Sequence, residues 1–257
     1  MCQLLGMNCN VPTDICFSFE GFRRRGGLTD HHRDGWGIAF FEGRGCRLFL
    51  DAKATIESPV ADLVRHYPIH STQVIAHIRK ATRGRVALEN THPFQRELWG
   101  RYWVFAHNGT LEDYAPELSP LYQPVGDTDS ERAFCHLLEG LRRAFPDGPK
   151  EEGALASTLR RLTADIARHG VFNYLLGNGT TLYAHCSTDL HFVTRQAPFG
   201  HAHLVDEDLT VDFSRLTRPD DRVTVIATQP LTDNEAWTRL AAGQLVAFRG
   251  GEAVADL

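Results

Sequence analysis

The chain has 257 residues, of which 42% are hydrophobic and 23% charged, and its formal net charge is −5 at pH 7. This length and apolar content suffice for one or two domains with a full core. Because the basic residues are spread along an acidic chain, nucleic acid and anionic membranes are poor candidate partners.

No stretch approaches the roughly 20 apolar residues of a membrane-spanning helix, and the first residues lack the charged start and apolar run of a secretion signal. We therefore expect a cytoplasmic protein. The six cysteines include no Cys-x-x-Cys pair, so free thiols are expected and neither a structural metal nor a cofactor is predicted.

Hydrophobic spacing and turn residues predict most elements of the chain. In chain order they are a strand over 2–9, a helix from 14 to 25, strands over 36–41 and 46–50, a helix over 58–64, strands over 73–78 and 102–106, helices over 129–145 and 152–168, and short strands near 171–176, 180–186, 191–195, 223–228 and 244–249. Strands at both ends that enclose a helical pair predict one α+β domain, residues 2–257, with two sheets.

The helix over 129–145 is the best defined of these elements. Its apolar residues fall on one stripe, and Thr128 and Glu131 have the spacing of a capping box at its start.

Cys2 directly follows the initiator methionine. Because Cys2 is small, we expect Met1 to be removed, which would place a thiol and a free α-amine on one carbon. An α-amine titrates near pH 7.7 to 8.0 and can take the thiol proton, and the thiolate is the attacking species. The alternative is that Cys2 simply begins a buried strand, since cysteine is among the most buried residue types.

Four polar clusters accompany Cys2, and each lies where a predicted element begins or ends. Arg79, at the exit of the 73–78 strand, offers a planar fork of donors for a carboxylate, although a surface salt bridge would explain it too. The 90–94 segment, Asn-Thr-His-Pro-Phe, by itself indicates a turn.

The other two clusters also have two interpretations. Asn108 and the backbone N–H of Gly109 could form an oxyanion hole, yet Asn-Gly is also a common tight turn. Asp129, in the first turn of a helix, would stay ionised and could bind an ammonium, or could merely start the helix. Together with Arg79, these groups complement the carboxylate, the ammonium and the side-chain amide of glutamine, and Cys2 supplies the attack.

In this order, the cysteine start, the strand-end arginine, the Asn-x-His-Pro loop, the His-Asn-Gly segment and the Thr-Asp-x-Glu helix start resemble a class II glutamine amidotransferase. That family belongs to the N-terminal nucleophile hydrolases, and the resemblance covers roughly residues 2 to 250. The segments Asp34-Gly35-Trp36-Gly37 and 227–233 are similar to its small stand-alone branch, which includes a γ-glutamyl hydrolase.

The resemblance implies a four-layer αββα sandwich with the cysteine at the end of a central strand. It also implies that Cys2 is the nucleophile and its α-amine the base, and that Asn108 with Gly109 binds the oxyanion. Arg79 would hold the substrate α-carboxylate, Asp129 would hold the α-ammonium, and His92 would be a further substrate-binding residue.

The chain departs from the family at three places. Larger synthases have tryptophan after the arginine and histidine before the next glycine, where this chain has Lys80 and Arg83. Their Arg-Gly-Tyr-Asp element is stretched here, from Arg25-Gly26-Gly27 to Asp34. These differences affect the cover of the pocket and leave strict glutamine specificity open.

The first hypothesis is therefore a glutamine amidotransferase-type amidohydrolase, which cleaves the γ-amide of glutamine through a γ-glutamyl thioester and releases glutamate and ammonia. Its ammonia could pass to a separate ammonia-using synthase, or the enzyme could hydrolyse a γ-glutamyl peptide or metabolite without ammonia transfer. A non-catalytic glutamine-binding regulatory domain and a metal protein using the thirteen histidines are the alternatives from other classes.

Overall fold

The computed structural model describes residues 2–81 and 84–256. Met1, whose removal is expected above, and Arg83, one of the departures from the family, lie outside the described residues.

The helices and strands have the following bounds. The helices are α1 (Cys16–Arg24), α2 (Pro59–His66), α3 (Asp129–Ala144) and α4 (Glu152–Ala167), with short 3-10 helices η1 (Thr55–Glu57), η2 (Leu88–Asn90) and η3 (Phe213–Arg215). The strands are β1 (Gln3–Thr13), β2 (Trp36–Glu42), β3 (Gly45–Asp51), β4 (Ser71–Ile78), β5 (Phe94–Leu98), β6 (Arg101–Leu111), β7 (Gly170–Gly177), β8 (Leu182–His185), β9 (His191–Gln196), β10 (His201–His203), β11 (Thr210–Asp212), β12 (Arg222–Ala227), β13 (Thr238–Arg239), β14 (Leu245–Arg249) and β15 (Glu252–Asp256).

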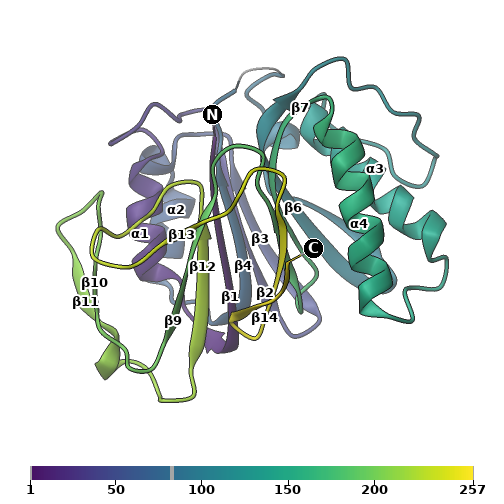
Figure 1. Ribbon diagram of the computed structural model, residues 1–257. Coiled ribbons are helices and arrows are strands. Elements are labelled where there is room, and N and C mark those ends of the chain that lie inside the picture. The colour runs from purple at the N-terminus through teal and green to yellow at the C-terminus, as the bar shows by residue number, and fades with distance from the viewer. Residues whose placement is uncertain (1, 82–83, 257) are drawn as a thin grey trace.

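Two antiparallel sheets face each other and are flanked by helices (Figure 1). Within the described residues, one of these sheets has seven strands in the order β13-β9-β12-β1-β4-β2-β3, and the other has six in the order β15-β14-β8-β7-β6-β5. Strands β10 and β11 pair separately as a small two-stranded sheet. Helices α1 and α2 cover the outer face of the first sheet, and α3 and α4 cover the outer face of the second. The predicted α+β architecture with two sheets is therefore confirmed.

Strand β1 lies near the middle of the seven-stranded sheet and contributes to two cores. Leu5 and Met7 pack outward in the cluster that contains the α1 phenylalanines, whereas Leu4 packs in the cluster between the two sheets. Successive side chains of a strand point to opposite faces, so alternate residues of β1 serve alternate cores. At Gly6 a β-carbon would lie 3.0 Å from Leu175 Cδ1, and the absence of a side chain there lets the sheets approach closely.

The start of helix α3 has the expected cap, with one difference. The Thr128 side chain accepts a hydrogen bond from the N–H of Glu131 at 3.2 Å. In a capping box the Glu131 carboxylate would return to the cap residue, but here its Oε2 accepts from the N–H groups of Val125 and Gly126, at 3.0 and 2.7 Å. Glu131 therefore fixes the chain that enters the helix as well as the helix itself.

The prediction that a strand ends before His107-Asn108-Gly109 is wrong. Strand β6 continues to Leu111 because β7 pairs with it from Val104 to Leu111, and Asn108 lies opposite Asn173 in this ladder. The Asn-Gly pair favours a turn locally, but a distant strand offers its backbone an extended partner. The short strands β5, β10, β11, β13 and β15 were also not predicted.

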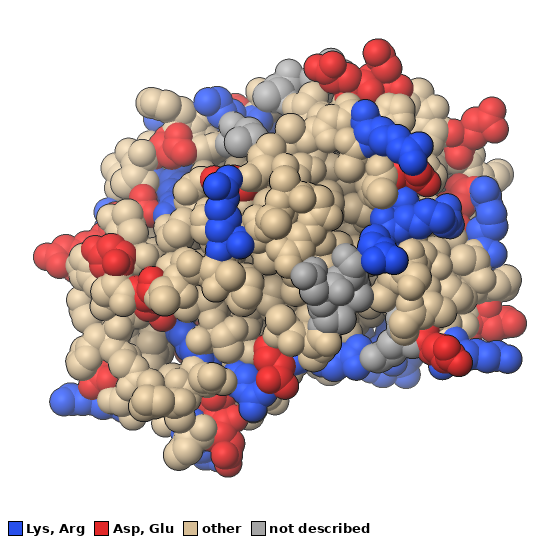
Figure 2. All heavy atoms as spheres, in the orientation of Figure 1, with Lys and Arg blue, Asp and Glu red and all other residues tan. Residues whose placement is uncertain are grey.

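The surface shows no block of like charge on the face in view, because Lys and Arg side chains alternate there with Asp and Glu (Figure 2). Among the described residues, no helix combines the length and apolar character needed to cross a membrane.

Candidate active site

Cys2 lies directly before β1, at the edge of the sandwich where the N-terminus is marked in Figure 1. Its Sγ contacts the first residues after β4: the N–H of Lys80 donates to Sγ at 3.3 Å, and the thiol donates to the Lys80 carbonyl oxygen at 3.4 Å. Strand β4 pairs with β1 through Gln3 and Ile78, so the sheet register itself brings Cys2 beside the exit of β4.

The environment of the thiol has opposing effects on its protonation. Burial raises the pKa of Cys2, whereas the hydrogen bond from Lys80 and the positive charge of Arg79 lower it, and the Asp34 carboxylate raises it. Burial outweighs the rest, so the resting group is a thiol that needs a base before it can attack.

Arg79 is buried at the exit of β4. Its backbone N–H donates to the Gly35 carbonyl at 2.8 Å, and its guanidinium Nη1 donates to the Arg85 carbonyl at 2.9 Å. Asp34 closes the same corner, since its carboxylate accepts from the N–H of Ala81 at 2.8 Å. The predicted carboxylate-binding arginine is thus held directly beside the predicted nucleophile.

Asn90 joins the Arg79 loop to the start of helix α3. Its Nδ2 donates to the Arg85 carbonyl at 3.1 Å and to Asp127 Oδ1 at 2.7 Å, and its Oδ1 accepts from the N–H of Asp127 at 3.0 Å. A β-carbon at Gly126 would lie 2.1 Å from Asn90 Oδ1, so this contact requires glycine. The sequence of the 90–94 segment by itself predicted only a turn, although the Asn-x-His-Pro loop of the family begins with this asparagine.

Asp129 connects α3 to the far end of β6. Its Oδ2 accepts from the N–H of Leu111 at 2.7 Å, and its Oδ1 accepts from the N–H of Ser130 at 2.9 Å. Behind it, His107 Nδ1 lies 2.8 Å from Ser130 Oγ. Burial lowers the pKa of His107, with the Asp129 charge opposing. The carboxylate predicted to bind an ammonium is therefore anchored to the strand that carries Asn108.

Asn108 points between the two sheets. Its Nδ2 donates to Thr228 Oγ1 at 3.4 Å, across to the residue that follows β12. Asn173, opposite Asn108 on β7, donates to the Asn108 backbone carbonyl at 3.0 Å. At Gly109 a β-carbon would lie 1.8 Å from the Val171 carbonyl oxygen, so no side chain fits at this position.

His92 is buried, as Arg79 and Asn108 are, and its neighbours are aromatic rings. Its ring packs at a tilt against the rings of His77 and Phe94, with centroid distances of 4.3 and 4.4 Å, and it is 3% exposed. Burial lowers the pKa of His77 to about 3 and the pKa of His92 well below its usual value, so both rings are neutral. The structure therefore places His92 in the packing beneath the site.

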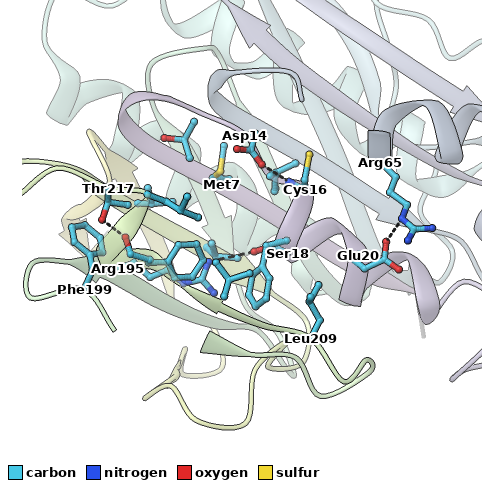
Figure 3. Close-up of a pocket in the computed structure, with 18 residues that line it drawn as sticks. Met7, Asp14, Cys16, Ser18, Glu20, Arg65, Arg195, Phe199, Leu209 and Thr217 are labelled. Atoms are coloured by element: carbon cyan, nitrogen blue, oxygen red, sulfur yellow. Dashed lines mark hydrogen bonds and ion pairs between the residues drawn. The ribbon is translucent and has the colours of Figure 1, made fainter. Parts of the chain in front are cut away.

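An apolar pocket lies apart from the candidate site. A cavity of about 410 Å³ opens on the outer face of the seven-stranded sheet, between α1 and the segment 199–217 (Figure 3). Arg195 crosses it over the Phe213 ring, at 4.7 Å, and pairs with Glu235 at 2.7 Å. Neither Cys2 nor Arg79 lines this cavity.

In the part of the chain that the structure describes, no group of three His, Cys, Asp or Glu side chains is placed to hold a metal ion.

The chain belongs to the class II glutamine amidotransferases: the family model described as "Glutamine amidotransferases class-II" matches residues 1–257. The chain is 54% identical to YafJ of Escherichia coli, a predicted glutamine amidotransferase, over 254 residues that span 99% of this chain and 100% of that protein.

Solved structures agree with this assignment. The crystal structure of a predicted glutamine amidotransferase from Pseudomonas aeruginosa PA01 matches with a TM-score of 0.79 and 50% identity, covering 98% of this chain and 99% of that one. Glutamine phosphoribosylpyrophosphate amidotransferase from B. subtilis matches with a TM-score of 0.58 at 13% identity, covering 98% of this chain and 48% of that one. The latter likeness shows the fold, and the predicted αββα sandwich of the N-terminal nucleophile type is confirmed.

Proposed function

We propose that this protein is an amidohydrolase of the glutamine amidotransferase type, built as one domain over residues 2–257, with Cys2 as its nucleophile. The observation that carries the proposal is a set of contacts that links the predicted residues. Cys2 Sγ contacts Lys80, which follows Arg79; Asn108 contacts Thr228, which bonds Leu4 on the strand of Cys2; and Asp129 bonds Leu111 on the strand of Asn108. The family match supports the same assignment.

The proposed reaction begins once Met1 is gone. The α-amine of Cys2 takes the thiol proton, and Sγ attacks the γ-carbonyl carbon of glutamine while Asn108 Nδ2 and the Gly109 N–H receive the negative oxygen. The carbon–nitrogen bond breaks, ammonia leaves with the transferred proton, and water then hydrolyses the γ-glutamyl thioester to glutamate. Arg79 holds the α-carboxylate, Asp129 holds the α-ammonium, and His92 supports the pocket from below.

The test uses protein whose N-terminus has been defined by intact mass. Protein that lacks Met1 is expected to hydrolyse L-glutamine and to be labelled once, at Cys2, by a glutamine-like diazoketone. The Cys2→Ala variant should lose both properties and serves as the matched control. Hydrolysis by protein that fully retains Met1 would overturn the mechanism, because its Cys2 nitrogen is locked in a peptide bond.

A second candidate is hydrolysis of a γ-glutamyl compound without ammonia transfer. It is supported by Lys80, whose backbone contacts the Cys2 sulfur and whose side chain is exposed, at the position where larger synthases have tryptophan. A carboxylate on the leaving amine would complement this cation. A panel of γ-glutamyl dipeptides against glutamine decides between the two: a kcat/KM higher for the dipeptides favours this candidate, and glutaminase turnover stimulated by a co-purifying synthase favours the first.

A regulatory domain without catalysis predicts a different result. It would bind glutamine in equilibrium dialysis and release no glutamate even after Met1 has been removed.

A further inference from the structure

Thr228 is tied to the strand that carries the nucleophile. Its backbone N–H donates to the Leu4 carbonyl at 3.1 Å, and its Oγ1 accepts from the Leu4 N–H at 2.9 Å. Leu4 is only two residues from Cys2, and Thr228 is 3% exposed. Two hydrogen bonds to one residue fix this hydroxyl relative to the start of β1.

The same hydroxyl contacts Asn108 from the opposite sheet. Asn108 Nδ2 donates to Thr228 Oγ1 at 3.4 Å, and Asn108 Oδ1 is buried with no hydrogen-bond partner within residues 2–81 and 84–256. Rotation of an asparagine amide about its terminal bond is broad and roughly two-fold, so the neighbours decide which end faces which way. Among the described residues, the Thr228 hydroxyl is the side-chain partner of this amide, and it already accepts from the Leu4 N–H.

We propose that Thr228 is a positioning residue for amide hydrolysis, with its hydroxyl keeping the NH₂ end of the Asn108 carboxamide toward the carbonyl that Cys2 attacks. The inference rests on the proposed function. An amide nitrogen has two N–H donors, so one bonds Thr228 while the other remains for the oxyanion. The two lone pairs of Thr228 Oγ1 receive the donors of Leu4 and Asn108, which couples the oxyanion donor to the strand of the nucleophile.

The test compares Thr228→Val, which keeps the shape and loses the hydroxyl, with Thr228→Ser, which keeps the hydroxyl. L-Glutamine and L-γ-glutamyl-p-nitroanilide are the substrates. Because the negative charge on the oxygen is absent from the bound substrate and develops on the way to the transition state, Thr228→Val should lower kcat about 10- to 100-fold with KM changed less than about threefold. Thr228→Ser should restore kcat to within about fivefold of the parent.

Thr224→Val is the matched structural control. Thr224 is a buried threonine on β12, the strand that Thr228 follows, and its hydroxyl also makes two hydrogen bonds, to Thr194 Oγ1 at 2.7 Å and to the Gly251 carbonyl at 2.8 Å. The Thr224→Val variant should lose thermal stability, as Thr228→Val does, but should keep the parental kcat. Alkylation of Cys2 by iodoacetamide, which displaces iodide and forms no oxyanion, should proceed at the parental rate in Thr228→Val.

The outcomes separate the two proposals. A Thr228→Val variant with the parental kcat, or an equal loss of kcat in Thr224→Val, would overturn the role of Thr228 while the parent remains an active hydrolase. A parent that hydrolyses neither substrate and resists the diazoketone would overturn the proposed function and this inference with it.

Discussion

At the scale of single residues, Arg79 and Lys80, which follow β4, make different contacts. The guanidinium of Arg79 is held under the chain at Arg85, and the backbone of the next residue, Lys80, contacts the Cys2 sulfur on both its N–H and its carbonyl side. In the proposed mechanism, a substrate bound by Arg79 would be positioned relative to the thiol through one peptide unit. Such short coupling favours the close approach of the reacting atoms that catalysis requires.

Replacement of this arginine tests the proposed carboxylate contact. Arg79→Lys keeps the charge but loses the planar fork, and the loss of a charged, bidentate contact is expected to raise KM for glutamine about 10- to 100-fold. The value of kcat should change less, because the α-carboxylate is bound equally in the ground and transition states. Steady-state glutamate release measures both constants.

Arg85→Lys is the control for that change, since its exposed side chain pairs with Glu89 at the surface. It should leave KM at the parental value. A kcat loss with unchanged KM in Arg79→Lys would contradict the assigned role.

Some site residues could be predicted from sequence, and others could not. Cys2 and Arg79 carry reactive or ionic groups in a recognisable order, so the pattern alone identifies them as candidates. The hydrogen bonds of Asn90 and Thr228 run to Asp127 and Leu4, which lie 37 and 224 positions away along the chain. Contacts of that kind are created by the packing of the sheets, and local pattern contains no signal for them.

At the scale of elements, the start of α3 fixes the proposed ammonium site. Thr128 caps the helix, Glu131 holds the entering chain, and Asp129 reaches back to β6. The starts of α2 and α3 were predicted well because their caps, Ser58 and Thr128, act within one turn. The continuation of β6 was missed because it depends on β7, some 65 residues later.

Removal of the α3 cap should weaken the molecule and its site together. Thr128→Ala is expected to lower the free energy of unfolding by about 1 kcal/mol, the usual value of an N-cap hydrogen bond. Urea denaturation at pH 7 measures the change. Thr128→Ser should recover most of it, since its hydroxyl can accept the same N–H.

Ser157→Ala, within α4, is the comparison. Its hydroxyl donates to the Gly153 carbonyl on an exposed helix surface, so its removal should cost little. Equal destabilisation by Thr128→Ala and Ser157→Ala would show that the Thr128 cap contributes nothing.

At the scale of the whole molecule, several buried histidines make stability depend on pH. Burial, together with the positive charge of Arg79, lowers the pKa of His77 to about 3, and the pKa values of His92 and His185 are lowered by burial as well. In the unfolded chain an imidazole has a pKa near 6.5, so below that pH the unfolded state binds protons that the folded state does not. Stability is present above about pH 6.5 and is lost as the pH falls.

The lowered pKa of His77 predicts a measurable slope of the free energy of unfolding against pH. Between pH 6.5 and 5, His77 alone should account for a loss of about 1–2 kcal/mol in the free energy of unfolding. Urea denaturation at several pH values should therefore give a shallower slope for His77→Phe than for the parent. His70→Phe, at an exposed position, should keep the parental slope. Parallel slopes for the parent and His77→Phe would contradict the prediction.

The extension of β6 through Asn108 and Gly109 has a consequence for how rigid the site is. A turn can open locally while the rest of the fold stays intact, but a residue inside a paired ladder opens only when its neighbours open. The backbone that carries the proposed oxyanion donors thus shares the opening free energy of the six-stranded sheet, and the amide hydrogens that pair β6 with β7 around Asn108 should be among the slowest in the chain to exchange. Folding itself therefore orients the backbone at Asn108 and Gly109, before any substrate binds.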